Sequence, residues 1–306
     1  MSDQRSVVYF TRDLSAEGLV RAFERVRGPL CGKVAVKLHT GEPQGPNIIP
    51  RPWVQAVTDR LKDACIVETN TYYEGGRYTT EEHRKTIAAN GWTFAPVDIL
   101  DEDGPADFPI SGGKWFDHMS LGAHISRYDS LLALTHFKGH TMGGFGGSDK
   151  NLGIGCADGR VGKAMIHTVT GSIDPWGISK EEFMERMTES TKAVCDLFGP
   201  RMAFVNVMRN MSVDCDCAGV DAAPVVTPDV GILSSSDILA VDQASVDLIY
   251  ALPEADRAAM CQRIETRKGL RQLSYMEELG MGNRAYVLVD LDHGEREISL
   301  PEALKK

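Results

Sequence analysis

The chain has 306 residues, of which 42% are hydrophobic and 25% charged, a composition typical of a globular protein with a substantial core. The formal net charge of −10 and the lack of a dense Lys/Arg run argue against nucleic acid or an anionic membrane as the main partner. The first residues, MSDQRSVVYF, do not have the pattern of a signal peptide, and the apolar runs are too short to span a bilayer, so we expect a cytoplasmic protein. Seven cysteines, an odd number, favour thiols or metal ligands over a disulfide framework.

Short apolar runs alternate with amphipathic stretches along the chain. Runs rich in Val, Ile and Leu predict buried strands at residues 33–38, 66–70, 131–137, 203–208 and 286–292. Helical spacing predicts helices after Pro50 and Pro52, from about Thr80 to Asn90, from Ser179 to Phe198, from Ile238 to Tyr250 and from Glu254 to Lys268. Ser179 and Glu182 have the spacing of a capping box. The alternation predicts an α/β fold with a largely parallel or mixed sheet flanked by helices.

We expect two lobes with the functional site between them. The stretch GSIDPWG at residues 171–177 is the best candidate for a boundary. It would separate an N-terminal α/β lobe, residues 1–175, from a C-terminal α/β lobe, residues 176–306. A single domain is the alternative.

The glycine-rich segment GHTMGGFGGSDKNLGIGC, residues 139–156, follows a predicted strand directly. Ligands of open α/β folds bind at the carboxyl ends of strands, and glycine lets the backbone approach them closely. The segment fails the dinucleotide-binding pattern, because the third glycine would fall on Asp149. It also fails the phosphate-loop pattern, because Lys150 is followed by Asn151.

Reactive side chains gather in and around this segment. Any one of them has an ordinary explanation as a satisfied polar group or a small core residue. Together they predict a functional site. The members are His136, Lys138, His140, Lys150, Cys156, Lys163 and His167.

A second cluster, SVDCDC, follows the predicted strand at 203–208. Cys215 and Cys217 are two residues apart, so both thiols of an extended segment point to one side and suit a shared metal. Two incidental loop thiols are the alternative. Asp214 and Asp216 would disfavour thiolates by like charge, so a metal would be needed to keep both thiols ionised.

Several motifs resemble the family of uncharacterized Fe-S center proteins, built on the domain of unknown function 362: KVAVKLHTGE, ETNTYYEGGR, HFKGHTMGGFGGSDKNLGIGCADGRVGK with His167, SVDCDC and DVGILSSSDILAVDQASVDL. Many relatives carry a ferredoxin-like cysteine insert after the position of His167, and this chain lacks it. The resemblance implies cluster ligands at Cys156, Cys215 and Cys217, which would leave one iron of a four-iron cluster open. His140 or His167 could fill that position, and mixed His/Cys ligation suits a single zinc or iron ion equally.

The glycine-rich turn is also similar, more distantly, to that of the nickel-pincer lactate racemases, which lack the CDC segment. That resemblance implies His140 as a catalytic base and Lys150 as the cofactor tether. His167 lies within one residue of where a metal ligand would fall.

Further polar residues are candidates for the same crevice. Lys37 and His39 end a predicted strand, and Arg77 follows the motif ETNTYYEGG, where its guanidinium suits a carboxylate. Asp242 is expected to orient a ligand from the second layer.

The sequence thus predicts a metal- or iron–sulfur-dependent enzyme of redox or lyase type that acts on a small anionic metabolite. His140, Lys150 and His167 would be catalytic, and Cys156, Cys215 and Cys217 would bind the metal or cluster. The substrate would be bound by Lys37, His39, Arg77, Lys138 and Lys163. A metal or cluster carrier and a nickel-pincer racemase or epimerase are the alternatives; a redox or cluster-delivery partner and a homodimer are also considered.

Overall fold

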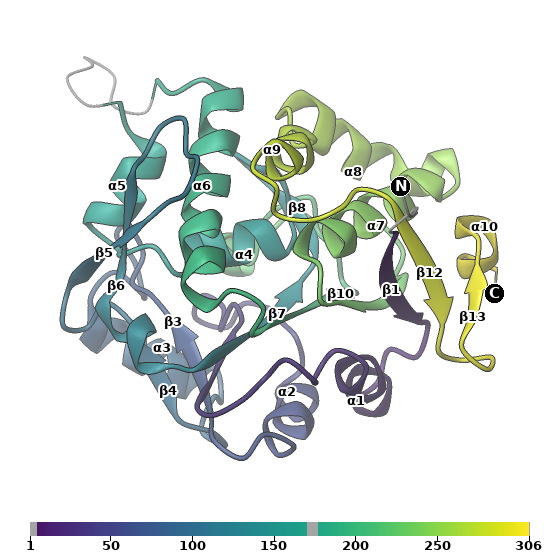
Figure 1. Ribbon diagram of the computed structural model, residues 1–306, viewed down its shortest axis with the longest axis horizontal. Coiled ribbons are helices and arrows are strands. Elements are labelled where there is room, and N and C mark those ends of the chain that lie inside the picture. The colour runs from purple at the N-terminus through teal and green to yellow at the C-terminus, as the bar shows by residue number, and fades with distance from the viewer. Residues whose placement is uncertain (1–4, 170–176, 306) are drawn as a thin grey trace.

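A computed structural model describes residues 5–169 and 177–305. Within this part of the chain a nine-stranded sheet forms the centre of the molecule (Figure 1). Its strands, in spatial order, are β13 (Arg296–Ile298), β12 (Tyr286–Asp290), β1 (Ser6–Thr11), β11 (Gly231–Ser235), β10 (Met202–Met208), β7 (Ser130–His136), β2 (Val34–Lys37), β3 (Ala64–Glu68) and β4 (Val97–Ile99).

The sheet is mixed, and its parallel half positions the site. The strands β10, β7, β2, β3 and β4 run parallel to one another. The strand β11 is antiparallel to both of its neighbours, β1 and β10. The predicted α/β fold with a largely parallel or mixed sheet is therefore confirmed, and each of the five predicted strands is present within a few residues of its expected bounds.

Helices cover both faces of the sheet because its buried strands are apolar on both sides. On one face Leu132 and Leu134 of β7 pack with α1 (Ala16–Glu24) and α2 (Arg51–Thr58). On the other, Leu131 and Ala133 pack with α4 (Ser148–Gly155), α6 (Lys180–Phe198) and α7 (Ile238–Ala251). The period-two alternation of a strand thus divides the core into two halves.

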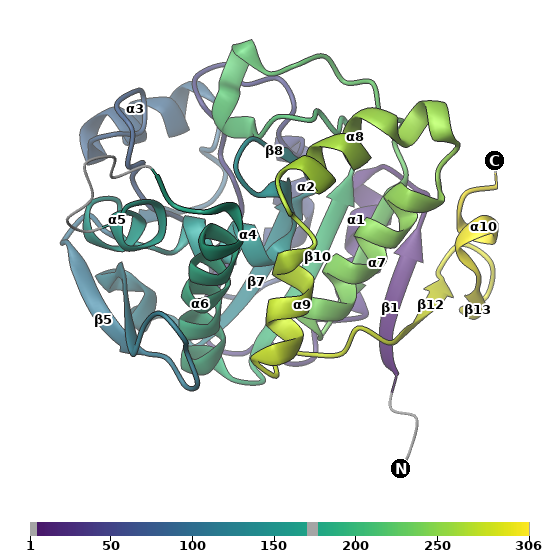
Figure 2. The same cartoon turned by 90° about the horizontal axis from the view of Figure 1, so that it is seen from above.

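The remaining elements surround this core, and α8 and α9 pack against α7. Seen from above, α3 and α5 lie toward one end and α10 with β13 toward the other (Figure 2). These elements are α3 (Thr80–Ala89), β5 (Pro105–Pro109), β6 (His118–Gly122), η1 (Ala123–Arg127), β8 (Lys138–His140), β9 (Gly144–Gly146), α5 (Val161–His167), η2 (Asp216–Asp221), α8 (Glu254–Thr266), α9 (Arg271–Glu278) and α10 (Leu300–Ala303).

The helix predicted from Ser179 is present as α6. The Ser179 side chain accepts a hydrogen bond from the Glu182 backbone, but the reciprocal bond of a capping box is found in α3 and α10 instead. The helix ends at Gly199, as expected. None of the described helices is long and apolar enough to cross a membrane.

Most of the proposed boundary at residues 171–177 lies outside the described residues. Strands from both sides of it belong to one sheet, since β10 pairs with β7. The division into lobes at residue 175 stays a prediction.

Helix α4 lies inside the glycine-rich segment and is held by Asp242. This carboxylate is fully buried and accepts hydrogen bonds from the backbone N–H groups of Ser148 (2.8 Å) and Asp149 (2.9 Å) at the helix N-terminus. Asn206 donates a third, at 2.8 Å. Asp242 was expected to orient a ligand from the second layer. Its hydrogen bonds go to the backbone of the helix that carries Lys150, so it holds that helix in place.

Asp149 is a second buried carboxyl group beside Asp242. One of its oxygens accepts from the Thr188 hydroxyl at 2.9 Å, and the other has no hydrogen-bond partner among the described residues. Burial raises the pKa of Asp149 to about 7, and the neighbouring charge of Asp242 adds to the shift. Burial also raises the pKa of Asp242, to about 6.

This pair predicts a pH dependence of stability. A raised carboxyl pKa means that the native state binds the proton more tightly, so folding stability falls as pH rises from about 4 to about 7. Asp149→Asn removes that titration. Between pH 5 and 8 we expect the free energy of unfolding of the variant to rise relative to the wild type by about 2 kcal/mol, measured by urea denaturation. A difference that stays constant with pH would contradict a raised pKa.

Candidate functional site

The site is a cavity of about 260 Å³ at the carboxyl ends of the parallel strands. Lys37 ends β2, Glu68 ends β3, and the segments after β7 and β10 supply His140 and Cys217. This is the edge where open α/β sheets bind ligands. The full lining is Lys37, His39, Glu68, Thr69, Thr71, Tyr72, Tyr73, Arg77, Lys138, His140, Thr141, Met142, Lys150, Asn151, Ile154, Gly155, Lys163, His167 and Cys217.

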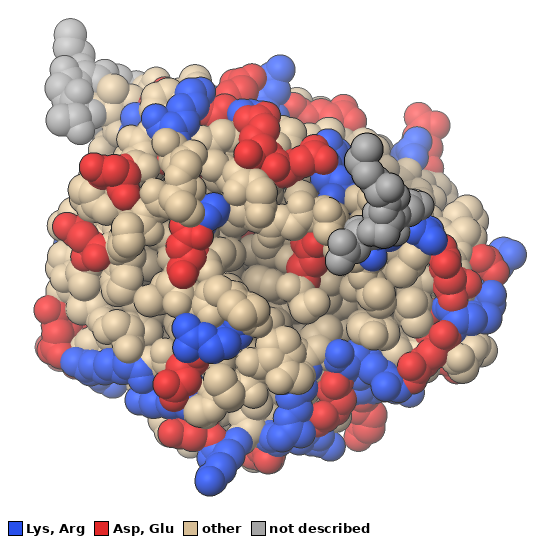
Figure 3. Space-filling model, viewed as in Figure 1, with Lys and Arg blue, Asp and Glu red and all other residues tan. Residues whose placement is uncertain are grey.

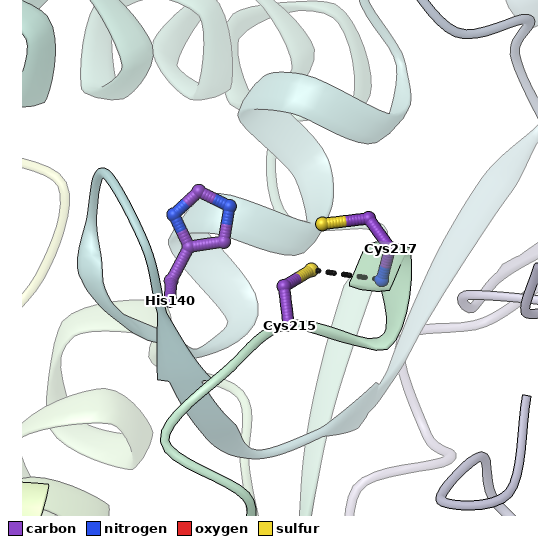
Figure 4. Close-up of side chains that lie close together, drawn as sticks. All are labelled: His140, Cys215 and Cys217. Carbon is purple, nitrogen blue, oxygen red and sulfur yellow. Dashed lines mark hydrogen bonds between the residues drawn. The ribbon is translucent and has the colours of Figure 1, made fainter. Parts of the chain in front are cut away.

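A histidine and two cysteines form a group that could hold a metal ion. One donor atom each from His140, Cys215 and Cys217 lies within 4.8 Å of the others. His140 comes from β8, and the two cysteines lie at the start of η2 (Figure 4). The two segments converge although about 75 residues separate them in sequence. The sulfur atoms of Cys215 and Cys217 lie near each other beside the imidazole (Figure 4).

Glycine at position 139 allows this convergence. A Cβ there would lie 2.2 Å from the backbone oxygen of Val213, closer than any real contact. The two segments instead join through a hydrogen bond of 2.8 Å from the Gly139 N–H to the Ser212 carbonyl. The glycine therefore brings the CDC loop against β8.

A backbone contact sets the tautomer of His140. The Gly143 N–H donates to Nδ1 of His140 at 2.7 Å, so Nδ1 is an acceptor and the ring proton of the neutral imidazole is on Nε2. Burial, followed by the charge of Lys150, lowers the pKa of His140, which is thus neutral near pH 7. A neutral imidazole is the form that binds metals.

The surroundings of Cys215 favour its thiolate. A hydrogen bond from the Cys217 thiol lowers its pKa well below the ordinary value and outweighs burial, and Lys150, His140 and His39 lower it further. The Lys150 ammonium donates to Sγ of Cys215 at 3.4 Å, and the Cys217 backbone N–H donates at the same distance. Cys217 is the protonated partner, because its hydrogen bond to Cys215 raises its own pKa.

From the sequence, Asp214 and Asp216 were expected to disfavour negative charge on the neighbouring thiols. In the structure, each carboxylate has positively charged partners of its own. Asp216 accepts from Nδ1 of His136 at 2.9 Å and pairs with Nζ of Lys138 at 3.1 Å. Burial would raise the pKa of Asp216, but these two partners outweigh it and hold the pKa well below its usual range. Asp214 pairs with Arg263 at 3.0 Å. Both carboxylates therefore lie in ion pairs of their own beside the thiols.

Lys150 is a buried ammonium ion rather than a free amine. Burial would lower its pKa, but the charges of Cys215 and Cys217 outweigh this effect and raise it. The amine expected to tether a cofactor is therefore engaged with a thiolate. Its helix, α4, carries it to the cavity wall.

A buried ion-pair network forms the wall opposite the metal group. Nζ of Lys37 donates to Glu68 at 2.8 Å, and Arg77 pairs with Glu42 at 2.7 Å and with Glu68 at 3.7 Å. Burial would raise the pKa of Glu68, but Lys37, His39 and Arg77 together lower it well below its usual value. Lys37 and Arg77, predicted to bind substrate, thus line the cavity with their charges partly compensated.

Helix α5 supplies Lys163 and His167, one turn apart. Nζ of Lys163 donates to the Thr69 hydroxyl at 2.7 Å and to the Asn70 carbonyl. Nδ1 of His167 lies 2.7 Å from the Lys163 carbonyl, so Nδ1 is the protonated nitrogen. Burial lowers the pKa of His167 to about 4, which leaves the ring neutral at pH 7.

Cys156 does not join the metal group. It lies at the C-terminus of α4, fully buried among core residues, and is neither a cavity-lining residue nor part of the His140 group. Burial raises the pKa of its thiol to about 12, so it is a neutral, apolar group. Of the predicted ligands, the structure thus brings Cys215 and Cys217 together with His140 and places Cys156 in the core.

Some cavity residues escaped the sequence analysis. Tyr72 and Tyr73 line the cavity, as do Thr69, Asn151 and Met142. Asn151 donates to the Thr135 hydroxyl at 2.9 Å and to the Lys37 carbonyl at 3.1 Å, which joins α4 to β7 and β2. One indication of these residues is present in the sequence: they lie next to strand ends or inside the glycine-rich segment.

The outer surface carries charges of both signs. On the face in Figure 3, acidic and basic side chains are interspersed, and neither forms a large patch of its own. The concentration of positive side chains is internal, in the cavity.

A comparison with protein families shows the family of this chain. The sequence profile of the family described as Domain of unknown function (DUF362) matches residues 34–247. No curated protein matches the chain. The lactate racemase apoprotein from Thermoanaerobacterium thermosaccharolyticum is similar with a TM-score of 0.46 and 13% identity, covering 81% of this chain and 58% of that one. A protein from Thermotoga maritima has a TM-score of 0.40 and 11% identity, covering 63% of this chain and 49% of that one. The chain spans less than two thirds of the length of either protein.

The charge state of Cys215 predicts a measurable titration. In protein treated with a chelator, we expect thiolate absorbance in the ultraviolet to persist below pH 7, where ordinary thiols are protonated, because Lys150 and two imidazoles stabilise the anion. Cys215→Ala should abolish this absorbance, and Lys150→Met should shift its midpoint to higher pH. Cys156→Ala is the matched control and should change nothing below pH 9, since that thiol stays protonated. Equal titrations of wild type and Cys215→Ala would contradict the thiolate.

Proposed function

Since this chain belongs to the DUF362 family, whose description assigns no activity, we propose from its cavity that it is a metal-dependent enzyme acting on a small anionic substrate. The observation that carries the proposal is the adjacency of two features. A His/Cys/Cys donor group lies against a buried cavity that is lined by four lysines and an arginine. A redox or lyase-type reaction suits cysteine ligation better than a racemisation does.

The donor set fits a single ion. Tetrahedral ligands with bonds of about 2.0–2.3 Å lie roughly 3.3–3.8 Å apart. The donors of His140, Cys215 and Cys217 lie within 4.8 Å of one another, so small side-chain movements suffice. A four-iron cluster needs its thiolates on different irons, farther apart, and Cys156 stands outside the group. We therefore favour zinc or iron as a single ion, with a fourth position toward the cavity.

Each part of the cavity has a chemical task in this proposal. A bound ion would supply Lewis acidity or, for iron, an electron. The cationic residues Lys37, Arg77 and Lys138 would bind and orient the negative groups of the substrate. His167, neutral at pH 7, could accept a proton. Without a bound ion, the Lys150 ammonium would stabilise negative charge on the sulfur of Cys215. With an ion bound, it would stabilise negative charge on the substrate or on that sulfur.

Two alternative functions are distinguished by the cavity. A carrier of metal or clusters needs thiols but has little use for a buried cluster of cations, so the lining favours an enzyme. A nickel-pincer racemase or epimerase is favoured by one observation, that His140, Lys150 and His167 all line the same cavity. The cofactor of such an enzyme would be covalently attached to Lys150. The mass of the purified chain would reveal this attachment.

Metal content after anaerobic purification tests the proposal. We expect about one zinc or iron ion per chain and no stoichiometric sulfide. Cys215→Ser and Cys217→Ser should each weaken metal binding about tenfold or more, because each removes a ligand. Cys156→Ala should retain the metal and serves as the matched control.

Other results would select other functions. Iron with stoichiometric sulfide would contradict the single ion and support a cluster. Nickel with a mass adduct on Lys150 would support the pincer alternative. Metal that passes readily to an apo-protein acceptor, without turnover of any small anion, would support the carrier. Protein that binds no metal under any condition would contradict the proposal.

A further inference from the structure

The four lysines of the cavity differ in what they contact. Three lie against an anion: Lys37 against Glu68 at 2.8 Å, Lys138 against Asp216 at 3.1 Å, and Lys150 against the Cys215 thiolate at 3.4 Å. Nζ of Lys163 instead donates to a hydroxyl and a backbone carbonyl, those of Thr69 and Asn70. Among the described residues, Lys163 is the cavity lysine with neutral hydrogen-bond partners alone.

The environment of Lys163 favours its neutral amine. The side chain is 5% exposed and lies among other cations. Burial lowers its pKa to about 8; the charge of Asp101 opposes this effect, while Arg77 and Lys37 add to it. Asp101 itself accepts hydrogen bonds from the backbone N–H groups of Asn70 (3.0 Å) and Gly159 (2.8 Å). Roughly a tenth of such lysines carry no proton at pH 7, against less than a thousandth of ordinary ones.

The backbone around Lys163 holds the amine in place. A Cβ at Gly162, the preceding residue, would lie 2.0 Å from the Ser120 carbonyl oxygen, so α5 packs directly against β6 there. The Lys163 N–H bonds to the Asp158 carbonyl at 2.8 Å. The hydroxyl of Thr69, which accepts from the amine, is itself bonded to the Gly155 carbonyl at 3.2 Å. The amine thus has a fixed position on a rigid element at the cavity wall.

We propose that Lys163 is a catalytic nucleophile that forms a Schiff base with the carbonyl group of a small oxo acid bound in this cavity. The inference deepens the proposed function and rests on its assignment of the cavity as the substrate site, but not on the metal. A buried lysine beside other cations is a recognised way to obtain an amine nucleophile near neutral pH.

The step is a condensation without net oxidation or reduction. The nitrogen lone pair of Lys163 forms a bond to the carbonyl carbon while the C=O π electrons move to oxygen, which takes the proton that the nitrogen releases. The hydroxyl group of the carbinolamine then takes up a proton from solvent and leaves as water. The nitrogen lone pair forms the C=N bond while the nitrogen keeps its remaining proton, so the product carries one positive charge. The positively charged iminium withdraws electrons from the neighbouring carbon, which suits cleavage of a bond there and hence lyase-type chemistry.

The other side chains of the cavity point to the substrate class. Lys37, Arg77 and Lys138 provide positive charge for a carboxylate, and Thr71 and Thr141 provide hydroxyl groups. The aromatic rings of Tyr72 and Tyr73 and the side chains of Met142 and Ile154 provide apolar wall. A volume of about 260 Å³ limits the occupant to a small metabolite. A short oxo acid has both the anionic group and the carbonyl that this lining requires.

Borohydride trapping tests the proposal on the purified full chain. With pyruvate as the probe and sodium borohydride as the reductant, we expect one covalent adduct per chain, with the mass of pyruvate minus one oxygen. Peptide mapping should locate it on Lys163. Lys163→Arg keeps the positive charge and should lose the adduct while retaining metal, whereas Lys85→Arg, a change at an exposed lysine, should form it as the wild type does.

Two kinds of outcome of the trapping experiment would overturn the proposal. An adduct on Lys150 would identify a different lysine as the nucleophile. Adducts spread over exposed lysines would show that no single lysine is specifically reactive. The absence of an adduct with pyruvate and with glyoxylate would exclude Schiff-base formation with short oxo acids. Mapping on the wild-type protein gives the answer even if Lys163→Arg fails to fold. Metal analysis of the same samples separates the two proposals: an adduct on metal-free protein supports Lys163 while contradicting the metal enzyme, and metal without an adduct does the reverse.

Discussion

Burial of several lysines in one cavity is the constraint on which the site depends. Taking a cation out of water costs several kcal/mol unless an anion compensates it, and removing one partner of a buried pair costs about 3–5 kcal/mol. The fold supplies those anions from different strands, with Glu68 at the end of β3 and Asp216 in the loop after β10. Cys215 is the third, because the Lys150 ammonium donates to its sulfur. The CDC loop therefore contributes to the charge balance of the cavity, in addition to the metal binding proposed for it.

The parallel strands decide which segments can meet in this cavity. Because β2, β3, β7 and β10 are neighbours and run in one direction, the residues that follow them emerge at one edge of the sheet. The glycine-rich segment is not a single loop at that edge. It forms the β8–β9 hairpin and then helix α4, and its glycines lie where another chain segment passes closely: the CDC loop at Gly139 and the Asp242 carboxylate at Gly147. The glycine content of the segment thus follows from packing around the site rather than from binding a phosphate.

The sequence predicted the apolar parallel strands and most of the cavity cations, and it failed where contacts are non-local. The strand β11, GILSS, ends in two serines and does not read as buried, yet their hydroxyl groups donate to the carbonyls of Ala22 and Val7. Helix α4 has no apolar periodicity from which it could be predicted. Its N-terminal N–H groups are satisfied by Asp242, which lies about 90 residues away in sequence. Cys156 has reactive neighbours in sequence but lies at the end of α4, where it joins the core. Patterns within a short stretch of sequence cannot indicate contacts with residues that lie far away along the chain.

The same charge balance explains why one amine of the cavity differs from the others. The anions Glu68, Asp216 and the Cys215 thiolate each lie beside one lysine, and the two carboxylates are further held by other donors. None of them is a hydrogen-bond partner of Lys163. An incoming carboxylate would therefore meet three lysines that lie against anions and one, Lys163, whose pKa burial lowers to about 8. Anion binding and nucleophilic attack require opposite protonation states of an amine, and the cavity separates them by giving each lysine a different partner.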